Sequence, residues 1–236
     1  MYLLTFSCFC VCLLYGTVAG ASQRIGLRTA TSNAGPAQFH SIVSRSSHPR
    51  QICNEEAWRY HFDPQRRSGL TPDEKQWLQQ QHNLYRRKIG ASNMEYMFWD
   101  ESLAASAQRH ANRCTFSHSQ GNYGENVWAA GYTQFNNAVR LWFEEGHCCG
   151  CTPFYSPCCG HYTQLNWATS NRVGCGYAVC DYVANSNPPG MRAVLVCQYT
   201  ERGNFIGAPA FSMAGAPCSE CPSYAPRCED GLCYPA

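Results

Sequence analysis

Charged side chains are scarce in this chain of 236 residues. Asp, Glu, Lys and Arg make up 14% of the sequence, against about 25% in an average globular protein. The 18 basic and 16 acidic residues leave a net charge of only +2. This balance argues against a basic nucleic-acid binder, a coiled coil or a disordered chain. The hydrophobic fraction of 44% is enough for a packed core, and the length suits one domain with some chain left over.

Several motifs are also missing. The sequence contains no HExxH and no Gly-x-Ser-x-Gly, the signatures of common metalloprotease and serine-hydrolase sites. It has no Asn-x-Ser/Thr sequon and no internal repeat, and no apolar run of 18 or more residues follows the N-terminus. We therefore expect no N-glycosylation and no transmembrane anchor.

The N-terminus has the composition of a secretory signal peptide. Residues 1–20 carry no charged side chain, and small residues follow the apolar stretch at Ala19, Gly20 and Ala21. The stretch is short for a membrane span, which is the alternative. We predict cleavage near Gly20 or Ala21 and a secreted, extracellular protein. Residues 21–70 are rich in Ser, Arg and Thr and predict a disordered leader or pro-segment. Its Arg66-Arg67 pair is either a processing site or a solvated basic pair.

Cysteine, in contrast, is abundant. Of 17 cysteines, Cys8, Cys10 and Cys12 would leave with the signal peptide. Fourteen remain, an even number that predicts up to seven disulfides in an exported chain, with the connectivity open. The spacing Cys218-x-x-Cys221 also suits zinc, but disulfides are favoured outside the cell. The fourteen are Cys53, Cys114, Cys148, Cys149, Cys151, Cys158, Cys159, Cys175, Cys180, Cys197, Cys218, Cys221, Cys228 and Cys233.

Hydrophobic periodicity changes along the chain. Thr71-Pro-Asp-Glu74 has the pattern of a capping box and begins a helix that Gly90 ends. Further helices are expected over about 100–113 and about 133–145, the latter with Phe135, Ala138, Val139, Leu141 and Trp142 facing inward. Short β-type runs follow at 173–180 and 193–199, with a turn at 187–190 between them. Helices first and strands later favour an α+β fold.

Four polar residues are candidates for chemistry: His118, Glu125, Glu145 and His161. Two imidazoles and two carboxylates are the ligand types of a zinc-class divalent ion. They come from separate segments, so their spacing does not show whether they converge. Glu144 is the alternative to Glu145 if the helix phase differs by one residue.

The segments around these residues carry a family resemblance. Gly124-Glu-Asn-Val-Trp128, Gly160-His-Tyr-Thr-Gln-Leu-Asn-Trp167, Val173-Gly-Cys-Gly176 and Val196-Cys-Gln-Tyr199 occur in this order. They resemble the signature segments of the CAP superfamily: cysteine-rich secretory proteins (SCP domains), antigen 5 or Tpx-1-related allergens, and plant pathogenesis-related 1 proteins. The segment Asn93–Asp100 and the Ser-Glu-Cys-Pro tail look most similar to the peptidase-inhibitor-15-like and LCCL-containing branch. No segment resembling an LCCL domain is present in this sequence.

The resemblance implies an α-β-α sandwich over residues 71–207 with a large cleft, followed by a small disulfide-rich hinge at 208–236. It places His118, Glu125, Glu145 and His161 in the cleft, where they would hold one divalent metal, Zn or Mg. Asn126, Tyr162 and Gln164 would support the cleft.

The function implied by the resemblance is a secreted, non-enzymatic protein that binds a ligand in this cleft, either a lipid or sterol or a protein partner. One alternative is a protease inhibitor. Another is a metal- or His-dependent endoprotease with Glu125 or Glu145 as general base. A channel-directed toxin would need a further cysteine-rich domain after the hinge.

One stretch departs from the family. Cys148-Cys149-Gly150-Cys151 and Cys158-Cys159 lie between Glu145 and His161, where other members often have aromatic and acidic residues. Five cysteines in twelve residues predict a rigid, cross-linked loop at one wall of the cleft.

Overall fold

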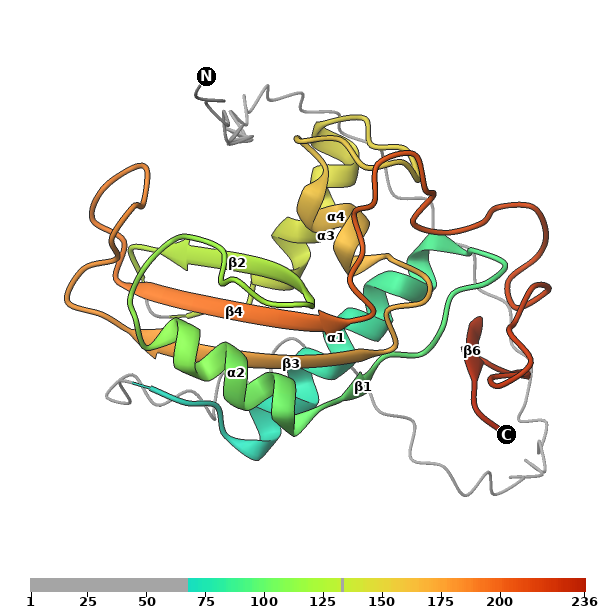
Figure 1. The fold of residues 1–236 in the computed structure, drawn as a ribbon, viewed down its shortest axis with the longest axis horizontal. Helices are drawn as coiled ribbons and strands as arrows, with labels where there is room; N and C mark the ends of the chain where they lie inside the picture. Colours follow the sequence, from blue (N-terminus) through green and yellow to red (C-terminus); the bar gives the residue numbers. More distant parts are fainter. Residues whose placement is uncertain (1–67, 133) are drawn as a thin grey trace, which may run out of the picture.

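The computed structural model describes residues 68–132 and 134–236, so the predicted signal peptide, most of the predicted leader and Cys53 lie outside the described residues. The chain forms a central sheet covered by helices on both faces (Figure 1). The helices are α1 (Pro72–Ile89), α2 (Glu101–Ala111), α3 (Ala138–Cys148) and α4 (Gly160–Leu165). The strands are β1 (Phe98–Trp99), β2 (Gly124–Ala130), β3 (Arg172–Val179), β4 (Ala193–Thr200), β5 (Arg227–Glu229) and β6 (Leu232–Tyr234).

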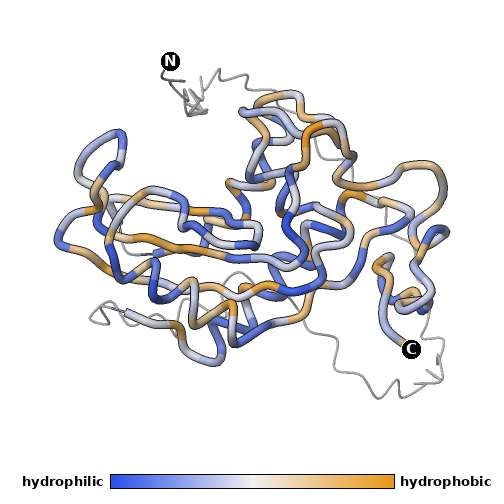
Figure 2. Tube along the Cα trace, viewed as in Figure 1, coloured by the Kyte–Doolittle hydropathy of each residue, from blue (hydrophilic) through white to orange (hydrophobic). Residues whose placement is uncertain are grey.

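The main sheet has four strands in the order β1-β3-β4-β2. Strand β4 runs antiparallel to both β2 and β3, and β1 lies parallel to β3. The two-residue periodicity of β4 separates two cores: Leu195 and Tyr199 belong to the cluster shared with α1 and α3, whereas Val194 and Val196 face α2. In Figure 2 the apolar colouring follows these central strands. The predicted α+β class and three-layer α-β-α sandwich are confirmed.

Helix α2 packs directly on the backbone of β3. A Cβ atom at Gly174 would lie 2.1 Å from the Ala104 nitrogen, and one at Gly176 would lie 2.2 Å from the Gln108 nitrogen. The Gly-x-Gly spacing therefore places both glycines on the face that α2 covers, since alternate residues of a strand share a face. Without side chains at these positions, the helix comes close enough to bury Ala107.

The observed ends of α1 and α3 can be compared with the predicted helix boundaries. Thr71 caps α1 with a complete capping box closed by Glu74, and Gly90 ends the helix in the left-handed conformation, as predicted. The predicted third helix was placed too early, because Asn136 and Asn137 form a turn and α3 begins only at Ala138. Phe135 is fully buried before the helix starts, whereas Leu141 is 40% exposed, so its predicted inward orientation is wrong.

Twelve of the described cysteines pair with one another, which confirms disulfides at these positions. The bonds are Cys114–Cys180, Cys149–Cys158, Cys151–Cys159, Cys175–Cys197, Cys218–Cys228 and Cys221–Cys233. Cys148 is also disulfide-bonded. Such a density of disulfides fits a protein that folds in an oxidising compartment. No helix in the described part of the chain is long and apolar enough to cross a membrane.

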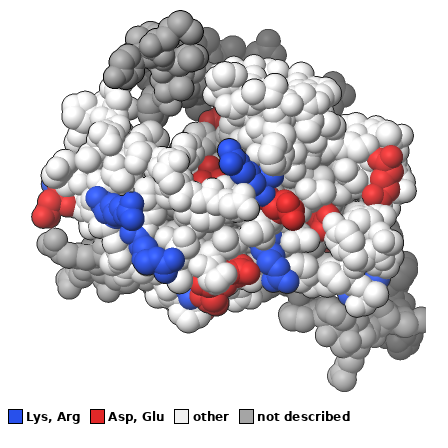
Figure 3. Space-filling model, viewed as in Figure 1, with Lys and Arg blue, Asp and Glu red and all other residues white. Residues whose placement is uncertain are grey.

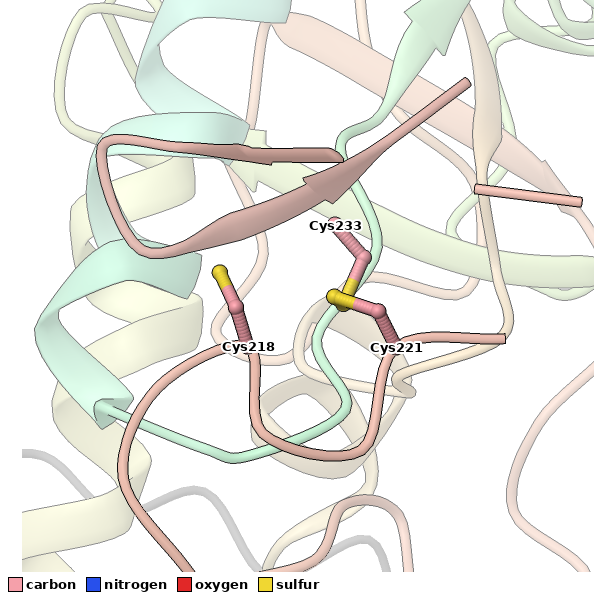
Figure 4. Close-up of side chains that lie close together, drawn as sticks. All are labelled: Cys218, Cys221 and Cys233. Carbon is pink, nitrogen blue, oxygen red and sulfur yellow. A yellow bond between two sulfur atoms is a disulfide. The ribbon is translucent and has the colours of Figure 1, made fainter. Parts of the chain in front are cut away.

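The tail cysteines form two adjacent disulfides. The sulfur atoms of Cys218, Cys221 and Cys233 lie within 4.8 Å of one another. Figure 4 shows the Cys221–Cys233 bond with Cys218 beside it, and Cys218 is itself bonded to Cys228. Because these sulfurs are already joined in disulfides, the arrangement supports the predicted covalent role over the zinc alternative.

The tail is attached to the domain along its length. Backbone bonds join Cys233 to Met94 and Tyr96, and the Tyr224 hydroxyl donates to Glu95 at 2.7 Å. Leu232 is fully buried in a cluster with Met94, Trp167 and Phe211. The predicted hinge-like tail is therefore a docked element, and in Figure 1 β6 lies beside the segment that leads into β1.

Candidate functional site

The candidate site is built around β2, which is the edge strand of the sheet. Its first residues, Gly124 to Asn126, pair with β4 on one side only. The other side faces α4 and the segment that carries His118, and Asn126 donates to the His161 carbonyl oxygen at 3.0 Å. An edge strand thus lets residues from three separate segments meet at one place.

His118 and Glu125 form the first pair. The Nδ1 atom of His118 lies 3.0 Å from Oε1 of Glu125. The imidazole is 65% exposed, whereas the carboxylate is only 4% exposed. The segment before His118 is fixed by the Cys114–Cys180 disulfide and by a backbone bond from Phe116 to Ala184. The exposed imidazole therefore projects from an anchored segment.

Glu125 is held by a dense set of donors. Burial by itself raises the pKa of Glu125, but hydrogen bonds from His118, from the side chain and amide of Ser119 and from Gln198 bring the pKa below its usual value. The Ser119 hydroxyl donates to the carboxylate, and Nε2 of Gln198 donates to it at 3.0 Å. Glu125 is thus an anionic acceptor whose oxygens are already engaged.

His161 and Glu145 form the second pair. The Nδ1 atom of His161 lies 2.5 Å from Oε1 of Glu145. The other oxygen, Oε2, accepts from the amides of His161 and Tyr162 at 3.1 and 3.2 Å. The imidazole stacks on Trp142 of α3 with ring centres 6.2 Å apart and planes 13° apart. This pair joins the last turn of α3 to the first turn of α4. The His161 side chain is 33% exposed.

The four predicted residues thus meet as two His–Glu pairs connected through Asn126. They do not form one tight cluster: in the described residues, the only group of three or more His, Cys, Asp or Glu ligand atoms within 4.8 Å is the tail cysteines. The molecular face in Figure 3 shows acidic side chains inside a recess, with a basic side chain at its edge.

In both His–Glu pairs, the same imidazole nitrogen, Nδ1, contacts the glutamate. Each histidine uses Nδ1 for its glutamate, and among the described residues neither Nε2 has a hydrogen-bond partner. A carboxylate on Nδ1 fixes the ring and its tautomer and leaves Nε2 as the metal ligand, which is a common outer-shell arrangement in zinc sites. The residue types therefore suit divalent-ion ligands, and Glu125 and Glu145 orient the imidazoles of His118 and His161.

The predicted supporting residues lie next to these pairs. Gln164 is buried, accepts from the Gly203 amide, and fills the space in which a Cβ at Gly124 would lie. Tyr162 packs on α3 against Phe143 rather than on β2. Glu144, the alternative candidate, is paired with Arg140 at 2.7 Å on the outer side of α3. The geometry therefore selects Glu145.

Three contributors were missed from the sequence: Ser119, Gln198 and Trp142. Gln198 stands directly opposite Glu125 in the register of β2 and β4, so strand pairing is the signal that would have found it. Trp142 precedes Glu145 by three residues and was assigned to the core, where its indole also serves as the platform for His161.

A buried polar chain reaches the same place from α1. His82 and Tyr199 are both fully buried. Nδ1 of His82 bonds the Leu78 carbonyl oxygen at 2.7 Å, so Nε2 accepts from the Tyr199 hydroxyl at 3.0 Å. Tyr199 also has a hydrogen bond with Asn126, which holds His161. Burial lowers the pKa of His82 to about 4 and raises that of Tyr199. The neutral pair thus supports Asn126 from within the core.

The chain is similar to known proteins both in sequence and in structure. The model of the cysteine-rich secretory protein (CAP) family matches residues 79–199. Protein lon-1 of Caenorhabditis elegans is 41% identical over 218 residues, which cover 84% of this chain and 63% of lon-1. Peptidase inhibitor 15 of Homo sapiens is 39% identical over 175 residues, 65% of this chain and 67% of that protein.

Two solved structures share the fold. Na-ASP-1 is 28% identical with a TM-score of 0.55 over 70% of this chain and 48% of that one. NaASP2 with Zn2+ is 26% identical with a TM-score of 0.53 over 70% of this chain and 97% of that one. Family model, relatives and fold agree, and the chain belongs to the CAP family of cysteine-rich secretory proteins.

Proposed function

We propose that this chain is a secreted, non-enzymatic CAP protein that binds a ligand, a lipid or sterol or a protein partner, at a cleft with one divalent ion. His118 and His161 would hold the ion through Nε2, and the ion would supply a Lewis-acidic contact for the ligand. The single observation that carries this proposal is the repeated pairing of Nδ1 with a glutamate, which leaves two oriented imidazoles with unbonded Nε2 atoms in the described residues. The crystal structure of the relative NaASP2 with Zn2+ adds support.

Zinc binding tests this proposal. Isothermal titration of the secreted, metal-free protein with Zn²⁺ should give about one site, and His161→Ala should weaken binding at least about tenfold. His147→Ala is the matched control, because His147 is an exposed histidine near the end of α3 and should leave the affinity unchanged. Equal affinities for wild type and both variants would mean that the ion is not held at the predicted pairs.

The geometry favours binding over turnover. A general base must contact the water or hydroxyl from which it takes a proton. Glu145 already accepts from three donors of α4, and Glu125 accepts from His118, Ser119 and Gln198. The Ser119 hydroxyl donates to Glu125 and has no bond to Nε2 of His118, so these residues lack the geometry of a Ser-His-acid triad.

A peptide-cleavage assay decides between the two functions. The proposal expects no cleavage of a mixed peptide library by the zinc-loaded protein. Cleavage that disappears in both His118→Ala and His161→Ala would instead establish the endoprotease alternative.

A protease inhibitor is the second candidate, and the names of two relatives favour it: peptidase inhibitor 15 and peptidase inhibitor 16. Such a protein would slow a peptidase at a stoichiometry near one, without being consumed. Titration against representative serine, cysteine and metallopeptidases tests this candidate directly. Inhibition that persists in His118→Ala and His161→Ala would place the inhibitory surface away from the cleft.

A further inference from the structure

The His161–Glu145 pair depends on the relative position of two helix ends. Glu145 lies in the last turn of α3, and His161 lies in the first turn of α4, which has only six residues. A helix of this length is not stable on its own, so its position depends on tertiary contacts. Its N-cap residue, Cys159, makes no side-chain capping bond. The free amides of His161 and Tyr162 are instead satisfied by the Glu145 carboxylate, 3.1 and 3.2 Å away.

Two disulfides lie at these helix ends. Cys149 is the C-cap residue of α3, and its bond to Cys158 ends one residue before the N-cap of α4. Cys151 is bonded to Cys159, the N-cap residue itself. Both bonds therefore join the end of the helix that carries Glu145 to the start of the helix that carries His161.

The same cysteines also contact the pair through the backbone. The Cys149 amide donates to the Glu145 carbonyl oxygen at 2.9 Å, and Sγ of Cys151 lies 3.2 Å from that oxygen. On the other side, the Cys159 carbonyl oxygen accepts from the amide and the hydroxyl of Thr163, at 2.9 and 2.8 Å. Cross-links and hydrogen bonds thus act on the same two turns of helix.

We propose that Cys149–Cys158 and Cys151–Cys159 are positioning disulfides that preorganise the Glu145–His161 pair for ligand binding. Without them, the short α4 would sample positions in which Glu145 does not cap it and His161 loses its oriented ring. A site that is formed only part of the time binds with an affinity reduced by that fraction. The binding part of this inference rests on the proposed function, whereas the structural part does not.

Three double variants test the proposal in the full chain. Cys149→Ala/Cys158→Ala and Cys151→Ala/Cys159→Ala each remove one loop disulfide and keep the other. Cys218→Ala/Cys228→Ala is the matched control, because its cysteines are 10 residues apart, against 9 and 8 in the loop, and it lies in the tail. Two quantities are measured: Zn²⁺ affinity by titration, and hydrogen exchange of the His161 and Tyr162 amides by NMR.

The two loop variants should bind Zn²⁺ at least about tenfold more weakly and lose protection at both amides, while the control stays within about twofold of wild type. Loop variants that match the control in affinity and protection would overturn the proposal, and so would weaker binding with unchanged amide protection. If wild type itself binds no Zn²⁺, the proposed function fails, and amide protection alone decides this inference.

A further pair of variants applies if the loop variants do not fold. Glu145→Ala keeps all disulfides and removes the carboxylate that caps α4, so both amides should exchange faster. Glu144→Ala removes the neighbouring carboxylate, which is paired with Arg140, and should leave the two amides protected. If the His161 and Tyr162 amides stay protected in Glu145→Ala, the Glu145 carboxylate does not cap α4. The disulfides would then have no Glu145–His161 contact to preorganise, and the proposal would be wrong.

Discussion

At the scale of single residues, His82 makes the stability of the fold pH-dependent. Its folded-state pKa of about 4 lies below the ordinary value of 6.5, so the unfolded chain binds a proton first as the pH falls. The stability contributed by neutral His82 is therefore complete well above pH 6.5 and is lost as the pH falls from 6.5 toward 4. The free energy of unfolding should drop by about 2 kcal/mol between pH 8 and pH 5 from this group.

Urea denaturation at several pH values measures this drop. The carboxylate of Glu125 has a lowered pKa and loses its contribution only below its usual value of 4.5, so it does not contribute to the drop above pH 5. His82→Gln keeps a polar side chain but removes the titrating ring, and its decrease in stability should be smaller by about 2 kcal/mol. An identical slope in both proteins would show that His82 does not titrate on unfolding.

The buried polar residues around His82 could not be predicted from the sequence. In α1 the apolar residues Leu78 and Tyr85 lie at helical spacing and are buried. His82, Asn83 and Arg86 are equally buried, but a pattern of apolar residues does not identify buried polar ones. Their burial depends on partners far along the chain: Arg86 donates to the carbonyl oxygens of Leu165, Trp167 and Ala168. Such partners are known only once the fold is known.

At the scale of elements, the contact between α2 and β3 requires a strand without side chains on one face. Gly176→Ala would place a Cβ 2.2 Å from the Gln108 nitrogen, a backbone atom that moves only if the helix moves. We expect a loss of about 3 kcal/mol in the free energy of unfolding. Gly131→Ala is the control, because the only atom near its added Cβ is the Gly190 oxygen at 3.5 Å. Chemical denaturation that places both variants within about 0.5 kcal/mol of each other would contradict the close packing.

Element prediction succeeded where local chemistry is strong. The capping box at Thr71 and the apolar runs of β3 and β4 identified α1 and the two central strands. Strands β1 and β2 and helix α4 were not predicted, although the motifs in β2 and α4 were. Helix α4 has six residues and β1 has two, lengths at which pattern carries little information. Both candidate pairs depend on these short elements, so residue types were predictable and their pairing was not.

At the scale of the whole molecule, a shared core and backbone pairing join the tail to the domain. Cross-links inside the tail, Cys218–Cys228 and Cys221–Cys233, give it local rigidity, but no described disulfide connects it to residues 68–207. Its attachment depends on the pairing of β6 with the segment around Glu95 and on the buried side chain of Leu232. The family resemblance implied a hinge at 208–236. The four tail cysteines leave little apolar material there, and the domain supplies the missing core.

This shared core leads to the last prediction, that tail and domain unfold together. Leu232 is fully buried against Met94, Trp167 and Phe211, and Leu232→Ala should remove about 2–5 kcal/mol of stability from the entire protein. Leu141→Ala, at a leucine that is 40% exposed, should cost much less. Thermal unfolding followed by far-UV circular dichroism and by tryptophan fluorescence should give one coincident transition, shifted downward in Leu232→Ala. A separate early transition that alone responds to Leu232→Ala would instead mean that the tail folds and unfolds independently, as a true hinge would.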